Sequence, residues 1–91
     1  MKHKITIWEL DAKRIQDMRS NLEQALKELG IDADMQINCE EPLVERNDLL
    51  GKLPSIQLDE LKKVWSCGYD KTIAKDEFAG LLTYWQEQGM L

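Results

Sequence analysis

Hydrophobic and polar residues alternate over the first stretch of the chain, residues 4–10. The two isoleucines fall on one face, and a threonine, a tryptophan and a leucine fall on the other. Because both faces carry apolar groups, this pattern predicts a β-strand in the middle of a sheet. In residues 33–39, by contrast, Met35, Ile37 and Cys39 share one face and polar residues fill the other. That pattern predicts a strand near a sheet edge, with one face in water.

Three other stretches are predicted to be helices. Apolar residues recur every three or four positions from Ile15 to Leu29, and Gly30 follows as a C-cap. A short helix is expected to have Pro42 in its first turn, where the missing N–H costs nothing, and to run to about Leu50. A last helix is expected over residues 74–88. Its acidic first turn suits the helix dipole, and its buried stripe is Phe78, Leu81, Leu82 and Trp85.

Residues 55–58 and 61–66 read as two further strands joined by a tight turn at residues 59–60. The element order is therefore β-α-β-α-β-β-α, in which the first strand, helix and second strand form a right-handed parallel unit. At this length, a four-stranded mixed sheet between helices on both faces is the main way to bury three apolar helical faces. The 91 residues suffice for one domain, residues 1–91.

Composition and charge exclude several classes of partner. The chain is 43% hydrophobic and 32% charged, as in an ordinary globular protein, and its net charge is −5. An acidic chain without clustered lysine and arginine is not expected to bind nucleic acid. No apolar run approaches the ~20 residues of a membrane span, so no membrane partner is expected either. The N-terminus enters a strand rather than a signal-peptide core, which makes the cytoplasm the expected location.

Two segments carry a resemblance to a known family. The segment "NLEQALKELGIDADM" resembles the first helix and second strand of small thioredoxin-like proteins, in particular the glutaredoxin-sized redox-disulfide branch of archaea and bacteria, and "LPSIQLD" is similar to their cis-proline segment. The resemblance covers residues 5–85. It implies a thioredoxin-like three-layer sandwich with the strand order second, first, third, fourth, and a cis bond between Leu53 and Pro54. It also implies that the glycine of "CG", Gly68, lies where the family has a glycine lining its groove.

The sequence departs from this family at the active site. Counting back from Gly30, the two cysteines of C-x-x-C should stand near Ala12 and Ile15, where "AKRI" is found instead. Alanine has no heteroatom to activate at the helix N-terminus, and no cysteine occurs before Cys39. Dithiol–disulfide exchange needs an attacking and a resolving sulfur close together. We therefore expect no dithiol oxidoreductase activity at this position.

The two cysteines of the chain lie elsewhere. In the implied strand order Cys39 and Cys67 are on opposite sheet edges, roughly 14 Å apart at ~4.8 Å per strand step, so no disulfide is expected between them. Cys39 continues the alternation of the second strand and is expected to be an inert core thiol. Cys67 and Gly68 are expected to return to the rim of Asp11 and Ala12. There Cys67 is a candidate catalytic thiol, whose pKa Lys13 or Lys71 would lower where the loops bring them near.

Other candidates point to structural roles. His3 is expected to be a solvated terminal residue, and Glu9 and Asp11 to act as caps at a helix start rather than as catalysts. Three tryptophans, Trp8, Trp65 and Trp85, are expected in or at the core, and no metal site or cofactor is expected.

Two functions stay open at this point. The first is a non-catalytic protein-binding or peptide-binding module with a groove formed by Asp11, Ala12, Leu53, Pro54, Cys67 and Gly68. The second is a monothiol redox protein that uses Cys67 to form mixed disulfides with glutathione or a partner. The oligomeric expectation is a monomer or a weak homodimer, and a structural subunit pairing through the wet edge strand is a third possibility.

Overall fold

The structure is a computed structural model that describes residues 3–49, 51–58, 63–66 and 71–91. Four strands and three helices occur in this part of the chain. They are β1 (His3–Trp8), α1 (Ala12–Leu29), β2 (Ala33–Asn38), α2 (Glu41–Arg46), β3 (Ser55–Leu58), β4 (Lys63–Ser66) and α3 (Lys75–Glu87).

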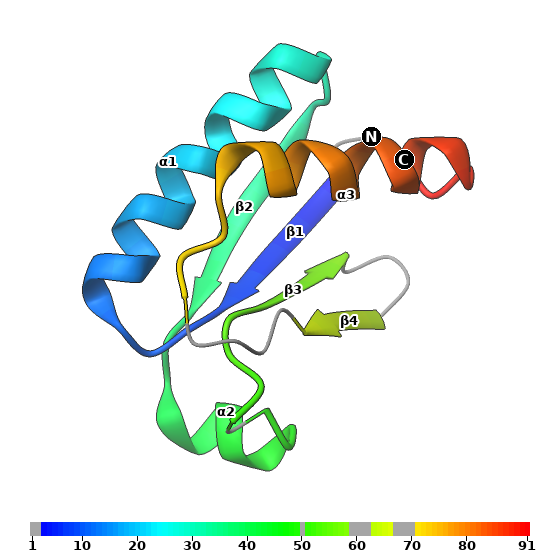
Figure 1. Ribbon diagram of the computed structural model, residues 1–91. Coiled ribbons are helices and arrows are strands. Elements are labelled where there is room, and N and C mark those ends of the chain that lie inside the picture. The colour runs from blue at the N-terminus through cyan, green and yellow to red at the C-terminus, as the bar shows by residue number, and fades with distance from the viewer. Residues whose placement is uncertain (1–2, 50, 59–62, 67–70) are drawn as a thin grey trace.

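The strands lie in the order β2-β1-β3-β4 (Figure 1). β1 pairs parallel with β2, from His3↔Ala33 to Trp8↔Asn38. It pairs antiparallel with β3, from Ile5↔Leu58 to Trp8↔Ser55, and β4 is antiparallel to β3. The central position predicted for β1 from its two apolar faces is therefore confirmed. Its end, the end of β2 and the beginning of β3 all meet at one end of the sheet (Figure 1).

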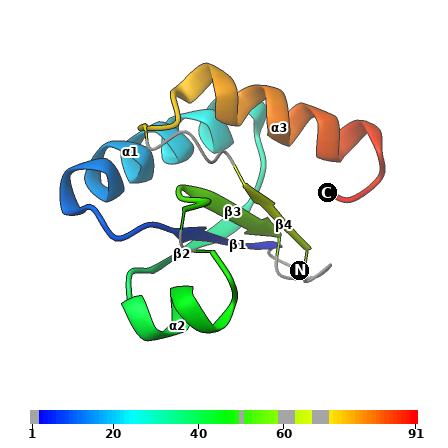
Figure 2. The same cartoon turned by 60° about the horizontal axis from the view of Figure 1, so that its bottom comes forward.

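The predicted four-stranded thioredoxin-like three-layer sandwich is wrong as stated. The body of the sheet is a mixed group of three strands, β2-β1-β3, and the four-residue β4 is an outer addition that pairs only with β3 among the described strands. α1 and α3 lie together on one face, whereas α2 is the one described helix on the other face, beneath one end (Figure 2). Since α2 has six residues, it is too short to form a full second layer. Over the described residues, the protein is an α/β fold with a three-stranded mixed body and three helices.

α1 begins and ends as its sequence predicts. Asp11 has extended backbone angles and caps the first turn, and Gly30 adopts the left-handed conformation with φ +66°. The N–H of Gly30 donates to the carbonyl of Lys27, and that of Ile31 donates to the carbonyl of Leu26. This is the closure that a C-cap glycine makes possible.

The main core lies between the sheet and the paired helices α1 and α3. Its buried strand residues come from β1 and β3, and the half-buried Met35 and Ile37 of β2 pack at its side. The helices contribute apolar stripes at helical spacing, namely Met18, Leu22, Ala25 and Leu26 from α1 and Phe78, Leu82 and Trp85 from α3. The ring centroids of Trp65 and Trp85 are 4.8 Å apart. The predicted core positions of the tryptophans are confirmed, with Trp65 half-buried at the side of the cluster.

Two features differ from the sequence pattern, and a third lies outside the described residues. α2 ends at Arg46 rather than near Leu50, because the chain turns at Asn47 and at Asp48, whose φ is +58°. His3 begins β1 and is half-buried instead of lying in a solvated terminus. The predicted turn of the last hairpin, residues 59–60, lies outside the described residues.

Candidate functional site

The sequence-predicted groove residues gather where β1 ends and β3 begins. The register pair Trp8↔Ser55 joins these two strand ends, so the residues after Trp8 and those before Ser55 leave the sheet side by side. We call residues 9–12 and 53–54 the rim. Of the six predicted groove residues, it contains Asp11, Ala12, Leu53 and Pro54. The other two, Cys67 and Gly68, lie outside the described residues.

Asp11 and Ala12 form the beginning of α1. The Asp11 carboxylate accepts a hydrogen bond of 2.9 Å from the backbone N–H of Arg14, which is the bond of an N-cap residue. Its predicted role as a cap is confirmed. Ala12 is the first residue of the helix and is exposed. The rim therefore presents a methyl group at the position where the resemblance implies a cysteine.

Glu9 is the rim residue whose environment the sequence does not reveal. Its side chain is 2% exposed. Oε2 accepts bonds from the N–H groups of Leu10, at 2.7 Å, and Asp11, at 3.2 Å. Oε1 lies 3.2 Å from Nη1 of Arg14, in an ion pair whose arginine side chain is 23% exposed. A carboxylate that already accepts from three donors orients the loop before α1, and this favours a positioning role over a catalytic one.

The second half of the rim precedes β3. The Leu53–Pro54 peptide bond is cis, as expected. Pro54 and Ser55 are buried and Leu53 is half-buried. The Ser55 hydroxyl donates a 2.8 Å hydrogen bond to the carbonyl of Lys52, which closes the turn before the strand.

The rim stands on a small apolar cluster of its own, on the α2 side of the sheet. Trp8, Val44 and Leu49 are its buried base, each at most 8% exposed, and three half-buried leucines pack against them. We call these leucines, Leu10, Leu43 and Leu53, the rim ledge. Trp8 is held in place by a 3.1 Å bond from its Nε1 to Oε1 of Gln57 on β3. The ledge thus joins the segment after β1, the helix α2 and the segment before β3.

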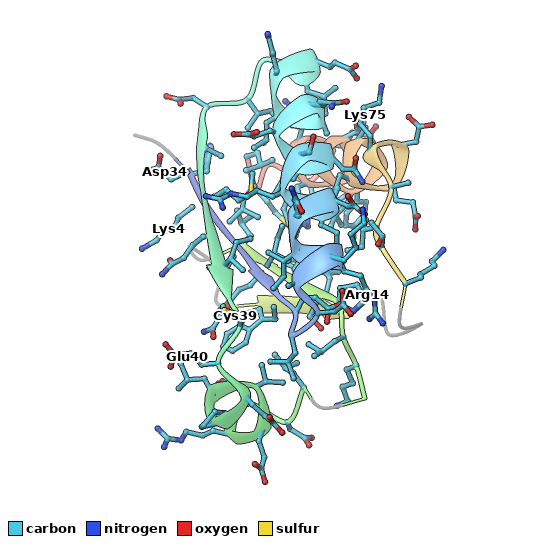
Figure 3. The ribbon with its side chains drawn as sticks, turned by 90° about the vertical axis from the view of Figure 1, so that its left-hand side faces the viewer. Lys4, Arg14, Asp34, Cys39, Glu40 and Lys75 are labelled. Atoms are coloured by element: carbon cyan, nitrogen blue, oxygen red, sulfur yellow. The ribbon has the colours of Figure 1, made fainter. Side chains whose placement is uncertain are left out.

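Cys39 is not the core thiol that the alternation predicts. β2 ends at Asn38, whose carbonyl accepts the last ladder bond from the N–H of Glu9. Cys39 follows this end and is exposed, at the point where the chain leads into α2 (Figure 3). Cys39 is exposed because the chain leaves the sheet after Asn38, one residue before the sequence alternation stops. Cys67 lies outside the described residues, so its predicted separation from Cys39 stays a prediction.

Metal ligands do not converge in the described part of the chain, where no group of three or more His, Cys, Asp or Glu side chains could hold an ion. Over the same residues, no helix combines the length and apolar character needed to cross a membrane.

Comparison with known proteins adds no family to this geometry. No protein-family model, curated protein or solved structure matches the chain. The resemblance to thioredoxin-like proteins therefore stays a prediction.

Proposed function

We propose that this protein is a non-catalytic module that binds an extended protein or peptide segment at the rim. The observation that carries the proposal is the rim ledge. Leu10, Leu43 and Leu53 come from three separate segments, yet they pack on one buried base and each keeps part of its surface exposed. Apolar side chains that are held in place and partly open to solvent provide a contact surface for an apolar side chain of a partner.

The neighbouring groups suit binding better than chemistry. Ala12 is exposed and small, so α1 begins beside the ledge without a bulky or reactive side chain. Glu9 is engaged by two N–H groups and by Arg14. The first cysteine in the sequence is Cys39, after β2. These features support a preformed surface whose rim residues, 9–12 and 53–54, include no cysteine.

The monothiol alternative depends on Cys67, which lies outside the described residues, and no described contact favours it.

We also propose that the protein is located in the cytoplasm, as expected from the sequence. Fractionation of cells that express the full chain tests this location.

The experiment selects ligands from a random peptide-display library against the full chain and measures the affinity of a selected peptide by fluorescence anisotropy. Ala12→Arg places a long cationic side chain on the rim at an exposed position. Gln86→Arg makes the same type of change at an exposed position of α3. We expect Ala12→Arg to weaken binding by about tenfold or more, equal to ~1.4 kcal/mol, and Gln86→Arg to bind like wild type. Equal affinities of the two variants would contradict a binding site at the rim.

A further inference from the structure

The surface beside the rim ledge is strongly acidic. The range 40–48 contains four acidic residues, Glu40, Glu41, Glu45 and Asp48, against one basic residue, Arg46. All five side chains are exposed. Asp48 lies 3.6 Å from Lys52 in an exposed ion pair. The three glutamates carry no ion pair with any described residue.

These charges stand on the same short segment as the ledge. Glu40 is the N-cap residue of α2 and makes no side-chain capping bond, and Glu41 is in the first turn. Leu43 of the ledge is one turn away or less on the same helix, and Val44 of the buried base follows it. Figure 3 shows Glu40 next to Cys39, where β2 leads into α2. Asp11, which is also exposed, adds a carboxylate on the α1 side of the ledge.

Two cations near the rim, Lys13 and Arg14, do not neutralise this negative charge, because each pairs with another carboxylate. Lys13 is bonded to Asp17 on α1 at 2.8 Å, and Arg14 is turned inward to the buried Glu9. Lys13, Arg14 and Lys52 are thus each paired with another carboxylate. The remaining cation of this region, the exposed Arg46 on α2, stands against three exposed glutamates. An apolar contact surface with unpaired carboxylates at its border favours a partner of opposite charge.

We propose that the partner segment carries an apolar anchor residue flanked by lysine or arginine. The anchor packs on the rim ledge, and the flanking cations lie against Glu40, Glu41 and Glu45. This inference rests on the proposed function, because it specifies the chemistry of the segment that binds at the rim.

The test uses three blocked peptides with one central Thr-Leu-Val segment, flanked on each side by Lys-Lys, Ser-Ser or Glu-Glu. Their affinities for the full chain are measured at low and at high salt. We expect the lysine peptide to bind about fivefold or more tighter than the serine peptide, and the glutamate peptide to bind weaker than both. The differences should shrink at high salt, because exposed charges are screened.

Two variants locate the effect. Glu40→Gln combined with Glu41→Gln removes two charges beside the ledge, and Glu23→Gln combined with Glu87→Gln removes two exposed charges from α1 and α3. The first variant should lose most of the lysine preference and still bind the serine peptide like wild type. The second should keep the preference.

The outcomes separate the two proposals. Equal binding of the three peptides, or an equal loss of preference in both variants, would overturn the basic-partner inference and leave the rim as a peptide site. Failure of all three peptides to bind, the neutral one included, would contradict the proposed function and this inference with it.

Discussion

Replacing the buried Glu9 by glutamine tests whether this carboxylate holds the rim in place. Glutamine is nearly isosteric, and its amide oxygen can keep the bonds from the N–H groups of Leu10 and Asp11. Its NH2 group then faces Arg14, which is also a donor, so the 3.2 Å ion-pair bond is lost. A hydrogen bond to a charged group contributes about 1.5–3 kcal/mol. We expect Glu9→Gln to lower the free energy of unfolding by about that amount, and Tm by about 6 °C or more.

Removing the other partner has a different cost. Arg14→Met leaves the Glu9 carboxylate, 2% exposed, bonded to backbone N–H groups alone. Breaking a fully buried pair in this way costs about 3–5 kcal/mol of stability. Because the Arg14 side chain is 23% exposed, we expect a loss at the lower end of this range. The double variant leaves no charge unpaired, so its loss should be smaller than the sum of the single losses by roughly 0.5–3 kcal/mol.

Urea unfolding followed by tryptophan fluorescence measures these differences, since Trp8 and Trp85 are 8% and 0% exposed. Lys13→Met is the control, because it removes an ion pair whose lysine side chain is 77% exposed and should cost only about 0.3–0.5 kcal/mol. If Glu9→Gln were no more destabilising than Lys13→Met, the assignment of Glu9 as the residue that positions the rim would be refuted.

Three further predictions concern other parts of the fold. Gly30→Ala should cost about 1 kcal/mol in urea unfolding, because φ is +66° while nothing lies within 4 Å of the added methyl group; an unchanged midpoint would contradict the left-handed cap. In a Cys67→Ser chain, Cys39 should react with a thiol reagent as fast in the native protein as in urea, since it is exposed, and strong protection would restore the core assignment. The hydrogen bond and the charge of Glu28 raise the pKa of Lys75 above its ordinary value of 10.5. The stability that this pair contributes is therefore present below that pH and lost as pH rises through the raised pKa. The stability difference between wild type and Lys75→Met should accordingly vanish in strong alkali, and a difference that persists there would contradict the pairing.

Local patterns were sufficient to predict several elements. α1 could be predicted because its apolar spacing and Gly30 both act within the helix itself. β1 could be placed centrally because a strand with apolar residues on both faces needs cover on both. The end of α2 could not be predicted in this way. Leu49 is 6% exposed and belongs to the cluster below the rim, so its apolar character reflects burial in a turn rather than a continuing helix.

The candidate site was predicted only in part, because it depends on contacts between distant segments. The positions of Asp11, Ala12, Leu53 and Pro54 followed from the element order. The burial of Glu9 could not be predicted in this way. Its ion pair requires the side chain of Arg14, in the first turn of α1, to reach back to the segment after β1. Likewise, no local pattern brings the three leucines of the rim ledge together. The second helical layer was overestimated because a helix pattern ending near Leu50 is longer than the six residues that α2 has.

Mapping a bound peptide by amide chemical shifts tests the central claim most directly. The isotopically labelled full chain is titrated with a peptide obtained by display selection, and the shifted amides are assigned. Binding at the rim predicts that the largest changes cluster at Leu10, Ala12, Leu43 and Leu53, with little change at Tyr84 on α3. Changes centred on α3, or spread evenly over the surface, would contradict the claim that this protein binds its partner at the rim.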